Sequence, residues 1–575
     1  MFYVVNNSGL YVFRHTNGSF PSKWAGIWAL DKKYVDYWAY KVNGVWLSPD
    51  LCAWSNGHNY KVGDITVRET VHVRQGKVIS SLTFEGNGDV SLDLEVGVNM
   101  RYRDEDLHGR KYSFDKGKIV SDLGKLTVKL MGSSFKPLGL YSTHNPGSNI
   151  PFALWYEQEQ SKFVPGIWHT EFKLKGKKKL NTYFIVDFKN KNVEEPFGEF
   201  RNRELSSLMK IAFSGLKTFA ANNHLKGVIA GYPYFNEIWV RDTLIVLPAY
   251  LYAGMFDYVR EILVFVSNYT KDRVPTVINS KGAKYYSDDV NPLWIIGLDY
   301  YIRHTRDLSI LNDVKDSLLS VVKYGINSIK DGVVHNSDYG TWMDSIPRPN
   351  AVEVQSLWIE AFKLAARMLR MLDIDIDLPN LNINPFIKKG IIVDRLDGGL
   401  TANILVPLFF KQVSHKVASR VIDLVEQELV TPSGVRTMGK SDRLFKGGYH
   451  TGAVWPLLNN LAAAAYINYD RDGVKFLTLN RSLVGKYCIN SIHETEGGAV
   501  AQAWSVLPVI HIVDEFILGI KPDLVNKRLY ILPNYVLNTS FKRKLLIGED
   551  VVNITYTVRK GLDIEVDGFS HKVVA

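Results

Sequence analysis

Cysteine is scarce in this 575-residue chain, which contains only Cys52 and Cys488. Two cysteines so far apart cannot build a disulfide framework or a thiolate metal site, and they favour a reducing compartment. The N-terminal segment MFYVVNNSGLYVF has no basic region followed by a long apolar run, and no stretch of about 18 apolar residues occurs anywhere. We therefore predict a cytoplasmic protein with neither a signal peptide nor a transmembrane helix, and no contact with a membrane.

Recognisable cofactor motifs are also missing. The chain contains no Walker loop, no dinucleotide-binding fingerprint, no zinc-ligand spacing and no nucleophile elbow. The GGYHTG segment at 447–452 follows no clear strand, which argues against a phosphate-binding loop. We expect chemistry that requires no cofactor and no metal.

Positive charge is in excess, with a net charge of +10, but Lys and Arg are spread along the chain. The exception is KLKGKKK at 173–179, which lies between two apolar stretches. We interpret it as a solvated hairpin turn in preference to a site for an anionic partner. We therefore predict no nucleic-acid partner, because net charge alone is a weak indication of one.

Three segments differ in pattern. Residues 1–195 alternate polar and apolar residues between frequent turns, which predicts an antiparallel β-sandwich. Residues 196–520, after a polar boundary, show about twelve helical patterns, the weakest near 383–390, as expected for an (α/α)6 toroid. Residues 521–575 return to a β pattern, which predicts a small C-terminal β element.

The segment 231–250, GYPYFNEIWVRDTLIVLPAY, joins an aromatic loop to an apolar helix. Arg241 offers a planar set of donors, Asp242 offers a carboxylate, and Tyr232 and Trp239 offer flat apolar faces. This combination suits a sugar ring, whose hydroxyls need polar partners and whose C–H face packs on an aromatic ring. A buried Arg–Asp pair under an aromatic cluster is the alternative.

Other loops of the helical segment also combine acidic and aromatic residues. Asp344 follows Trp342 in DYGTWMDSIPRP, where partial desolvation would raise its pKa and favour a general acid. The remaining candidates are Asp289, Glu353, His450, Trp455, Glu494 and Glu496. Each has an ordinary alternative as a turn residue, a helix cap or aromatic packing. Together they fit glycosidic bond cleavage, which needs two carboxyl groups beside the scissile bond.

Four motifs carry a family resemblance. GYPYFNEIWVRDTLIVLPAY, TWMDSIPRPNAVEVQSLW, YHTGAVWPLL and SIHETEGGAVAQAWSV, in this order, resemble the amylo-α-1,6-glucosidase domain of glycogen debranching enzymes over about residues 204–520. The resemblance implies a β-sandwich followed by an (α/α)6 barrel, similar to glucoamylases. It implies hydrolysis of α-1,6-linked glucose with inversion, on glycogen, limit dextrin or maltooligosaccharides.

The resemblance also implies roles for single residues. Asp344 would be the general acid and Glu494 the general base. The substrate-binding residues would be Tyr232, Trp239, Arg241, Asp242, Asp289, Trp342, Glu353, His450, Trp455 and Glu496. The chain departs from the family pattern at Val290, where an Asp is usual, and this leaves the bond preference open. The alternatives are an α-1,4-glucan glucohydrolase, a trehalase-like exo-glucosidase and a non-catalytic glucan-binding protein.

Overall fold

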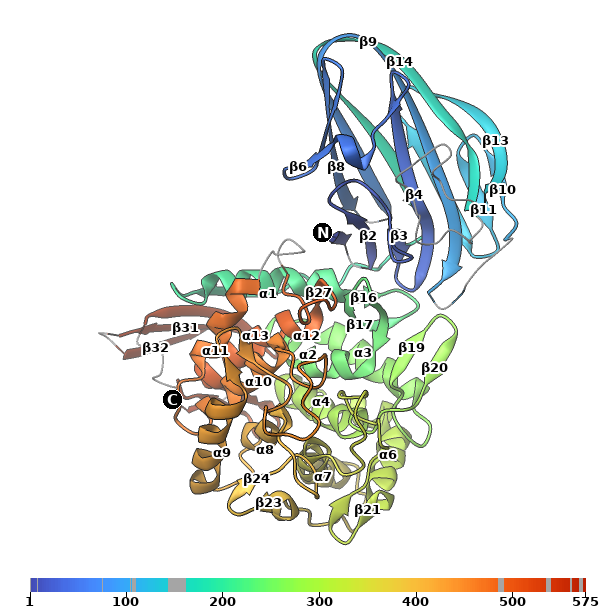
Figure 1. The fold of residues 1–575 in the computed structure, drawn as a ribbon. Coiled ribbons are helices and arrows are strands. Elements are labelled where there is room, and N and C mark those ends of the chain that lie inside the picture. Colours follow the sequence, from blue (N-terminus) through green and yellow to red (C-terminus); the bar gives the residue numbers. More distant parts are fainter. Residues whose placement is uncertain are drawn as a thin grey trace.

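The computed structural model describes residues 2–7, 9–74, 76–103, 105, 110–142, 162–483, 491–533, 539–558, 561–567 and 572–574. Figure 1 shows a β domain above a helical domain, with a small C-terminal sheet beside the helices. The predicted order of a β-sandwich, an (α/α)6 domain and a C-terminal β element is confirmed. Cys52 has a free thiol, and Cys488 lies outside the described residues.

The N-terminal domain is one large antiparallel sheet with a buried aromatic core. Its strands are β1 (Phe2–Asn7), β2 (Leu10–His15), β3 (Gly26–Ala29), β4 (Lys32–Val42), β5 (Val45–Trp46), β6 (Cys52–Trp54), β7 (His58–Val62), β8 (Ile65–Arg74), β9 (Lys77–Tyr102), β10 (Ser113–Asp115), β11 (Lys118–Ser121), β12 (Gly124–Leu130), β13 (Ser134–Ser142) and β14 (Lys162–Val186). Alternation of buried and exposed residues, as in ITVRETVHVR of β8, places one face of the strands in the core. Trp28 and Trp38 are fully buried there.

The two longest strands overturn the predicted hairpin at 173–179. This segment lies inside β14 and pairs with β9, so that Gly176 faces Gly86 and Lys177 faces Glu85. The Lys177 ammonium lies 2.6 Å from the Glu85 carboxylate on the exposed surface. Glycines on both strands resembled turn signals in the sequence, but they face each other across a continuous strand pair (Figure 1).

The helical domain contains a closed inner ring of helices. Its members are α2 (Val240–Tyr252), α4 (Val290–Thr305), α7 (Val352–Met371), α8 (Val406–Phe409) with the preceding 3-10 turn Ala402–Leu405, α10 (Pro456–Ile467), and the continuous segment of α12 (Ala503–Val506), α13 (Pro508–His511) and the π-helical turn Ile512–Ile517. Each packs on the next, and α13 packs on α2 to close the ring. Nearly every residue of α2 and α4 is buried, as expected for helices that are surrounded on all sides.

An outer set of helices covers this ring. It comprises α1 (Ser206–Phe219), α3 (Phe256–Tyr269), α6 (Lys315–Asn327) after the single turn α5 (Ile310–Asp313), α9 (His415–Glu428) and α11 (Val474–Leu479). These helices bury one face only. In α9 the buried residues Ala418, Val421, Ile422 and Val425 follow the spacing of a single stripe.

The weakest predicted helix, near 383–390, is absent. That segment forms a 3-10 turn, Asn384–Phe386, and a short hairpin of β23 (Ile387–Lys388) and β24 (Ile391–Ile392). It lies between α7 and α8, where an outer helix would complete the double ring. Two residues explain the difference. Pro385 disfavours α-helical backbone at the preceding residue, Asn384, and Gly390 adopts a φ of 79°, which lies outside the helical range.

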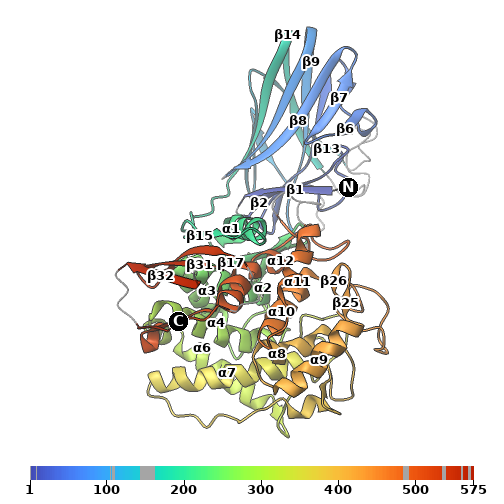
Figure 2. The same ribbon diagram turned by 90° about the vertical axis from the view of Figure 1, so that its left-hand side faces the viewer.

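The C-terminal strands are β28 (Ile520–Asp523), β29 (Arg528–Ile531), β30 (Phe541–Ile547), β31 (Asp550–Thr557), β32 (Gly561–Asp567) and β33 (Lys572–Val574). The linker strand β15 (Glu199–Arg201), which follows the irregular segment 188–198, pairs with β30. The strands β15, β30, β31 and β32 form one sheet, which Figure 2 shows near α1, and β28, β29 and β33 form another. Arg543 of β30 is fully buried and donates two 2.8–2.9 Å hydrogen bonds to Asp514 of the inner ring. Both ends of the helical segment are therefore fixed to each other.

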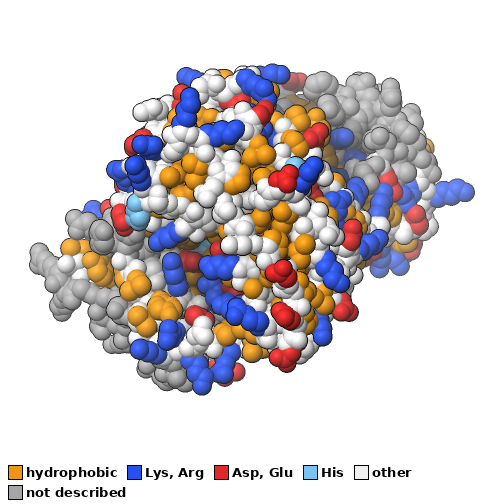
Figure 3. Space-filling view, turned by 90° about the horizontal axis from the view of Figure 1, so that it is seen from below, with side chains coloured by type: hydrophobic (Ala, Val, Ile, Leu, Met, Phe, Trp, Pro, Cys, Tyr) orange, Lys and Arg blue, Asp and Glu red, His pale blue; other side chains and the backbone are white. Residues whose placement is uncertain are grey.

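Figure 3, seen from below, shows basic, acidic and apolar side chains mixed over the helical domain. No helix in the described part of the chain is long and apolar enough to span a bilayer.

Candidate active site

Loops that precede the inner helices line a cavity of about 110 Å³ that combines aromatic and charged side chains. They come from the segments before α2, α7, α10 and α12, so the cavity lies at the N-terminal ends of the inner ring. Its walls are formed by Ala230, Phe235, Trp239, Arg241, Asp242, Trp342, Asp344, Tyr449, His450, Trp455, Glu494, Gln502 and Trp504. Three carboxyl groups and one guanidinium group thus face a common space.

The first turn of α2 supplies Arg241 and Asp242. Arg241 donates from Nε to Asp289 Oδ2 at 2.7 Å and from Nη2 to Ser287 Oγ at 2.7 Å. Asp242 Oδ1 accepts a 3.1 Å hydrogen bond from Gln502 Nε2. Both side chains are almost completely buried. The buried ion pair considered in the sequence therefore exists, but it joins Arg241 to Asp289, and Asp242 remains in the cavity wall.

Aromatic rings form much of the remaining wall. The ring of Trp342 lies 5.4 Å from that of Trp455 and 6.4 Å from that of Trp504. Among the described residues, Trp504 Nε1, Trp239 Nε1 and Gln502 Oε1 are buried without a hydrogen-bond partner. Buried polar atoms are normally hydrogen-bonded. A ligand rich in hydroxyl groups and with an apolar face would complement this wall.

Asp344 is the most exposed of the cavity's carboxyl groups, with 48% of its side chain accessible. Its loop is held by a 2.7 Å hydrogen bond from Trp342 Nε1 to Asn403 Oδ1. His450 Nδ1 lies 2.8 Å from Ser345 Oγ and 3.8 Å from Asp344 Oδ1. Burial, followed by Arg241, lowers the pKa of His450 to about 4, so this imidazole is neutral at neutral pH.

Glu494 differs from Asp344 in burial and in hydrogen bonding. It is 2% exposed, and it accepts hydrogen bonds from the Tyr449 hydroxyl at 2.7 Å and from the Ala499 amide at 3.2 Å. A Cβ atom on Gly498 would lie 2.6 Å from Glu494 Oε2, so only glycine leaves room for the carboxylate here. These contacts fix the direction of the Glu494 side chain.

The carboxyl groups of the cavity all bind protons more tightly than isolated ones. Burial raises the pKa of Asp242 to about 8, against the lowering effect of Arg241. Burial also raises the pKa of Glu494 to about 7, while the hydrogen bonds of Tyr449 and Ala499 lower it and Asp344 raises it. The pKa of Asp344 is raised, first by burial. Such shifts in a cleft are typical of groups that exchange protons.

A buried ion network supports the Asp344 loop from below. Arg348 is fully buried, donates from Nε to Asp394 at 2.9 Å and also contacts both oxygens of Glu353. Asp394 in turn accepts hydrogen bonds from Arg395 and Thr401. Glu353 therefore neutralises a buried arginine.

Four of the residues predicted from the sequence lie outside the cavity wall. Tyr232 packs between Tyr11 and Phe219, and its hydroxyl donates to the Thr218 carbonyl at 3.0 Å. Its ring thus belongs to the contact between the two large domains. The others are Asp289, which is paired with Arg241, Glu353, which is paired with Arg348, and Glu496, which is exposed.

Besides Ala230, four wall residues were not among the predicted ones. Tyr449, Gln502 and Trp504 lie within the motifs YHTGAVWPLL and SIHETEGGAVAQAWSV, and Phe235 lies in the segment 231–250. Neither Tyr449, which stands beside His450, nor Gln502, which precedes α12, has a sequence spacing that marks a binding residue. The chemical signal appears only when the loops are brought together.

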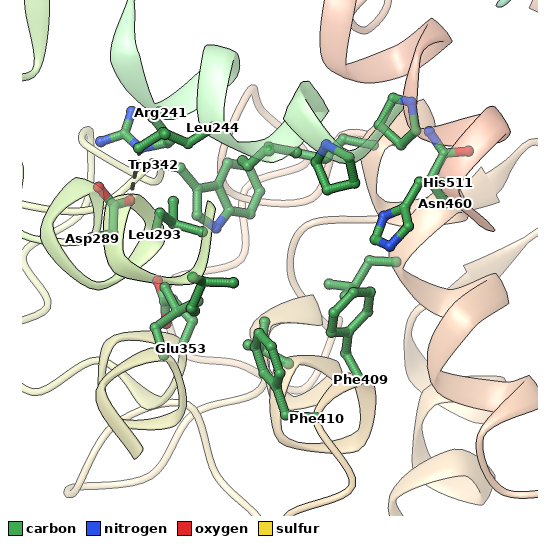
Figure 4. Close-up of a pocket in the computed structure, with 18 of the residues that line it drawn as sticks. Arg241, Leu244, Asp289, Leu293, Trp342, Glu353, Phe409, Phe410, Asn460 and His511 are labelled. Carbon is green, nitrogen blue, oxygen red and sulfur yellow. Dashed lines mark hydrogen bonds and ion pairs between the residues drawn. The ribbon is translucent and has the colours of Figure 1, made fainter. Parts of the chain in front are cut away.

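A second, apolar cavity of about 180 Å³ lies along the axis of the inner ring. Arg241 and Trp342 line both cavities, so the two are adjacent. Figure 4 shows Arg241 and Asp289 at one end, His511 and Asn460 at the other, and Phe409 and Phe410 between. Leu, Ile, Val, Phe and Pro side chains make up most of its wall. Such a space does not match the hydroxyl groups of a sugar.

Comparison with known proteins supports the resemblance seen in the sequence. Residues 201–383 match the family model described as amylo-alpha-1,6-glucosidase. No curated protein sequence matches the chain.

Solved structures show the same fold at low sequence identity. A bacterial glucoamylase complexed with acarbose has a TM-score of 0.56 and 11% identity, over 88% of this chain and 92% of that one. A putative kojibiose phosphorylase from the human microbiome has a TM-score of 0.59 and 10% identity, over 98% of this chain and 92% of that one. A rhamnosidase of Bacillus sp. GL1 has a TM-score of 0.54 and 11% identity, over 88% of this chain and 54% of that one. Residues 201–383 are therefore similar in sequence to the amylo-alpha-1,6-glucosidase family, and the chain shares the (α/α)6 fold of the glucoamylase and of the putative phosphorylase.

Proposed function

We propose that this protein is an inverting α-glucosidase that releases glucose from α-glucans. The bond that it cleaves is the α-1,6 bond at the branch points of glycogen-type glucans. A cytoplasmic location is part of the proposal. The observation that carries it is the presence of Asp344 and Glu494 in the wall of one aromatic cavity whose buried donors lack partners. The match of residues 201–383 to the amylo-alpha-1,6-glucosidase family supports the bond preference.

In this mechanism Asp344 protonates the glycosidic oxygen and Glu494 activates water on the opposite face of the sugar. Asp344 is open to the solvent side, where the leaving group departs. Glu494 receives two hydrogen bonds, which favour its ionised form, as a general base requires. The mechanism requires the proton on Asp344 and an ionised Glu494.

Arg241, Asp242, Trp239 and Gln502 would bind the glucose unit whose anomeric carbon reacts. Their donors and acceptors suit the ring hydroxyls, and the aromatic wall suits the C–H face. Inversion also requires a separation of about 6.5–9.5 Å between the two reacting carboxyl groups, to admit water. A crystal structure with a bound inhibitor would measure this separation.

Phosphorolysis, the reaction named for one protein of similar fold, fits the cavity less well. A phosphate nucleophile needs cationic partners. The cavity wall has three carboxyl groups, and its arginine is already paired with Asp289. Hydrolysis therefore remains the better proposal.

The test is glucose release from a panel of α-1,6, α-1,4 and α,α-1,1 substrates, with the product anomer followed by NMR. We expect β-glucose as the first product, with panose and isomaltose preferred over maltose and trehalose. Asp344→Asn and Glu494→Gln should each remove most turnover while leaving the melting temperature close to that of the wild type. α-Glucose as the first product, or wild-type rates in either variant, would refute the mechanism. Binding of an acarbose-like inhibitor without any glucose release would identify a glucan-binding protein instead.

A further inference from the structure

The strand that leads into the cavity carries a charged residue that the proposed mechanism does not use. In β18 (Phe235–Trp239), Phe235 and Trp239 both line the cavity, and their rings are 5.7 Å apart. Successive side chains of a strand point to opposite faces, so Glu237 lies on the same face, between them. Asn236 points the other way, where it donates to the Leu30 carbonyl at 2.7 Å.

Glu237 is held in place by the N-terminal domain. Arg103 donates from Nη1 to Glu237 Oε2 at 2.8 Å, and Asn279 donates to Oε1 at 2.7 Å. The Arg103 guanidinium lies 5.2 Å above the ring of Trp24, which fixes it on the sandwich. The sandwich thus places a cationic side chain beside the strand that lines the cavity. The Arg103 and Glu237 side chains retain 19% and 11% exposure.

Tyr286 completes this group from the helical domain. Its side chain is 41% exposed, and the next residue, Ser287, accepts a hydrogen bond from Arg241. Burial raises the pKa of the Tyr286 hydroxyl to about 12, with Arg241, Glu237, Asp344 and Arg103 as the charged groups that act on it. The hydrogen bond of Ser287 thus places the backbone at Tyr286 next to Arg241 in the cavity wall.

We propose that Arg103, Glu237 and Tyr286 form the binding subsite for the sugar unit on the leaving-group side of the scissile bond. This inference rests on the proposed function, because a general acid at Asp344 places the departing oxygen on its exposed side. The ring of Tyr286 provides a face for the leaving sugar, and Arg103 and Glu237 provide a donor and an acceptor for its hydroxyls. The sandwich domain then takes part in substrate selection.

The experiment compares panose, whose leaving group is a disaccharide, with α-glucosyl fluoride, whose leaving group is a single atom. Tyr286→Ala and Arg103→Ala should lower the ratio of kcat/KM on panose to kcat/KM on the fluoride about tenfold, equivalent to about 1.4 kcal/mol. Tyr286→Phe keeps the ring and should restore most of the ratio.

Asp31→Asn is the matched control for Arg103→Ala. Asp31 also links the sandwich to the helical domain, through 3.1 Å hydrogen bonds from the Ser280 amide and hydroxyl. If loosening of the domain contact were the cause, Asp31→Asn would lower the ratio equally, and the subsite would be refuted. Equal losses on both substrates, or no loss on panose, would also refute it. Failure of the wild type to cleave either substrate would refute the proposed function and this subsite together.

Discussion

The Tyr449 hydroxyl should set the lower end of the pH range in which the enzyme works. It donates a 2.7 Å hydrogen bond to Glu494, whose pKa is raised by burial to about 7. A hydrogen bond to the ionised form lowers a carboxyl pKa, so Tyr449→Phe should raise the pKa of Glu494. Since the general base must be ionised to act, the loss of activity on acidification should begin at a higher pH in Tyr449→Phe than in the wild type.

The size of this shift follows from the geometry. A hydrogen bond to a charged group contributes about 1.5–3 kcal/mol, and about 1.4 kcal/mol corresponds to one pH unit. Tyr449 is 42% exposed, so water can replace part of the lost donor. The Ala499 amide also remains bound to Glu494. We therefore expect the acidic limb to move up by about one pH unit, the lower end of the range.

The assay is kcat/KM for α-glucosyl fluoride between pH 4 and pH 9, where the acidic limb reports the free enzyme's base. Tyr339→Phe is the control, since Tyr339 is an exposed tyrosine on the loop that carries Asp344. Its profile should coincide with that of the wild type. An acidic limb in Tyr449→Phe that stays in place, or moves to lower pH, would refute the assignment of Glu494 as the base.

Three further substitutions test the cavity. Gly498→Ala should lower kcat at least tenfold at a nearly unchanged melting temperature, because the new Cβ meets Glu494 Oε2 at 2.6 Å; wild-type kcat would contradict this. Arg348→Met leaves the buried Glu353 without its cationic partner, while Asp394 keeps Arg395, and should destabilise the fold by about 3–5 kcal/mol in urea unfolding; a loss below about 1 kcal/mol would contradict the buried network. Asp242→Asn should lower kcat/KM about 10–100-fold on every glucoside, as expected for one lost hydrogen bond of about 1.5–3 kcal/mol. An effect confined to α-1,6 substrates would contradict the proposal that Asp242 binds the glucose unit common to all of them.

Local patterns were sufficient to predict the helices but not the long strands. The inner helices have continuous apolar sequences that need no knowledge of their neighbours. Strands β9 and β14 each contain glycines that read as turns, and only their mutual pairing shows that the chain continues. The segment near 383–390 had a weak helical pattern, which Pro385 and Gly390 override.

The site was predictable where a motif carried the chemistry. Asp344 and Glu494 stand out in acidic, aromatic loops, and the structure brings their loops to one cavity. Glu353 lies outside the wall of this cavity because it pairs with Arg348, which also binds Asp394, 46 residues further along; no local spacing indicates the contact between Arg348 and Asp394. Tyr449 acts through Glu494, 45 residues away, so its contribution is likewise visible only in three dimensions.

The C-terminal sheet has a consequence for how the molecule can be divided. A fragment that ends at residue 520 would keep Asp514 but lose the Arg543 guanidinium, which also donates to the Tyr252 carbonyl at the end of α2. It would also leave β15 without its partner β30. The helical domain should therefore fail to fold alone, and heat or urea should unfold it together with the C-terminal strands in a single cooperative transition.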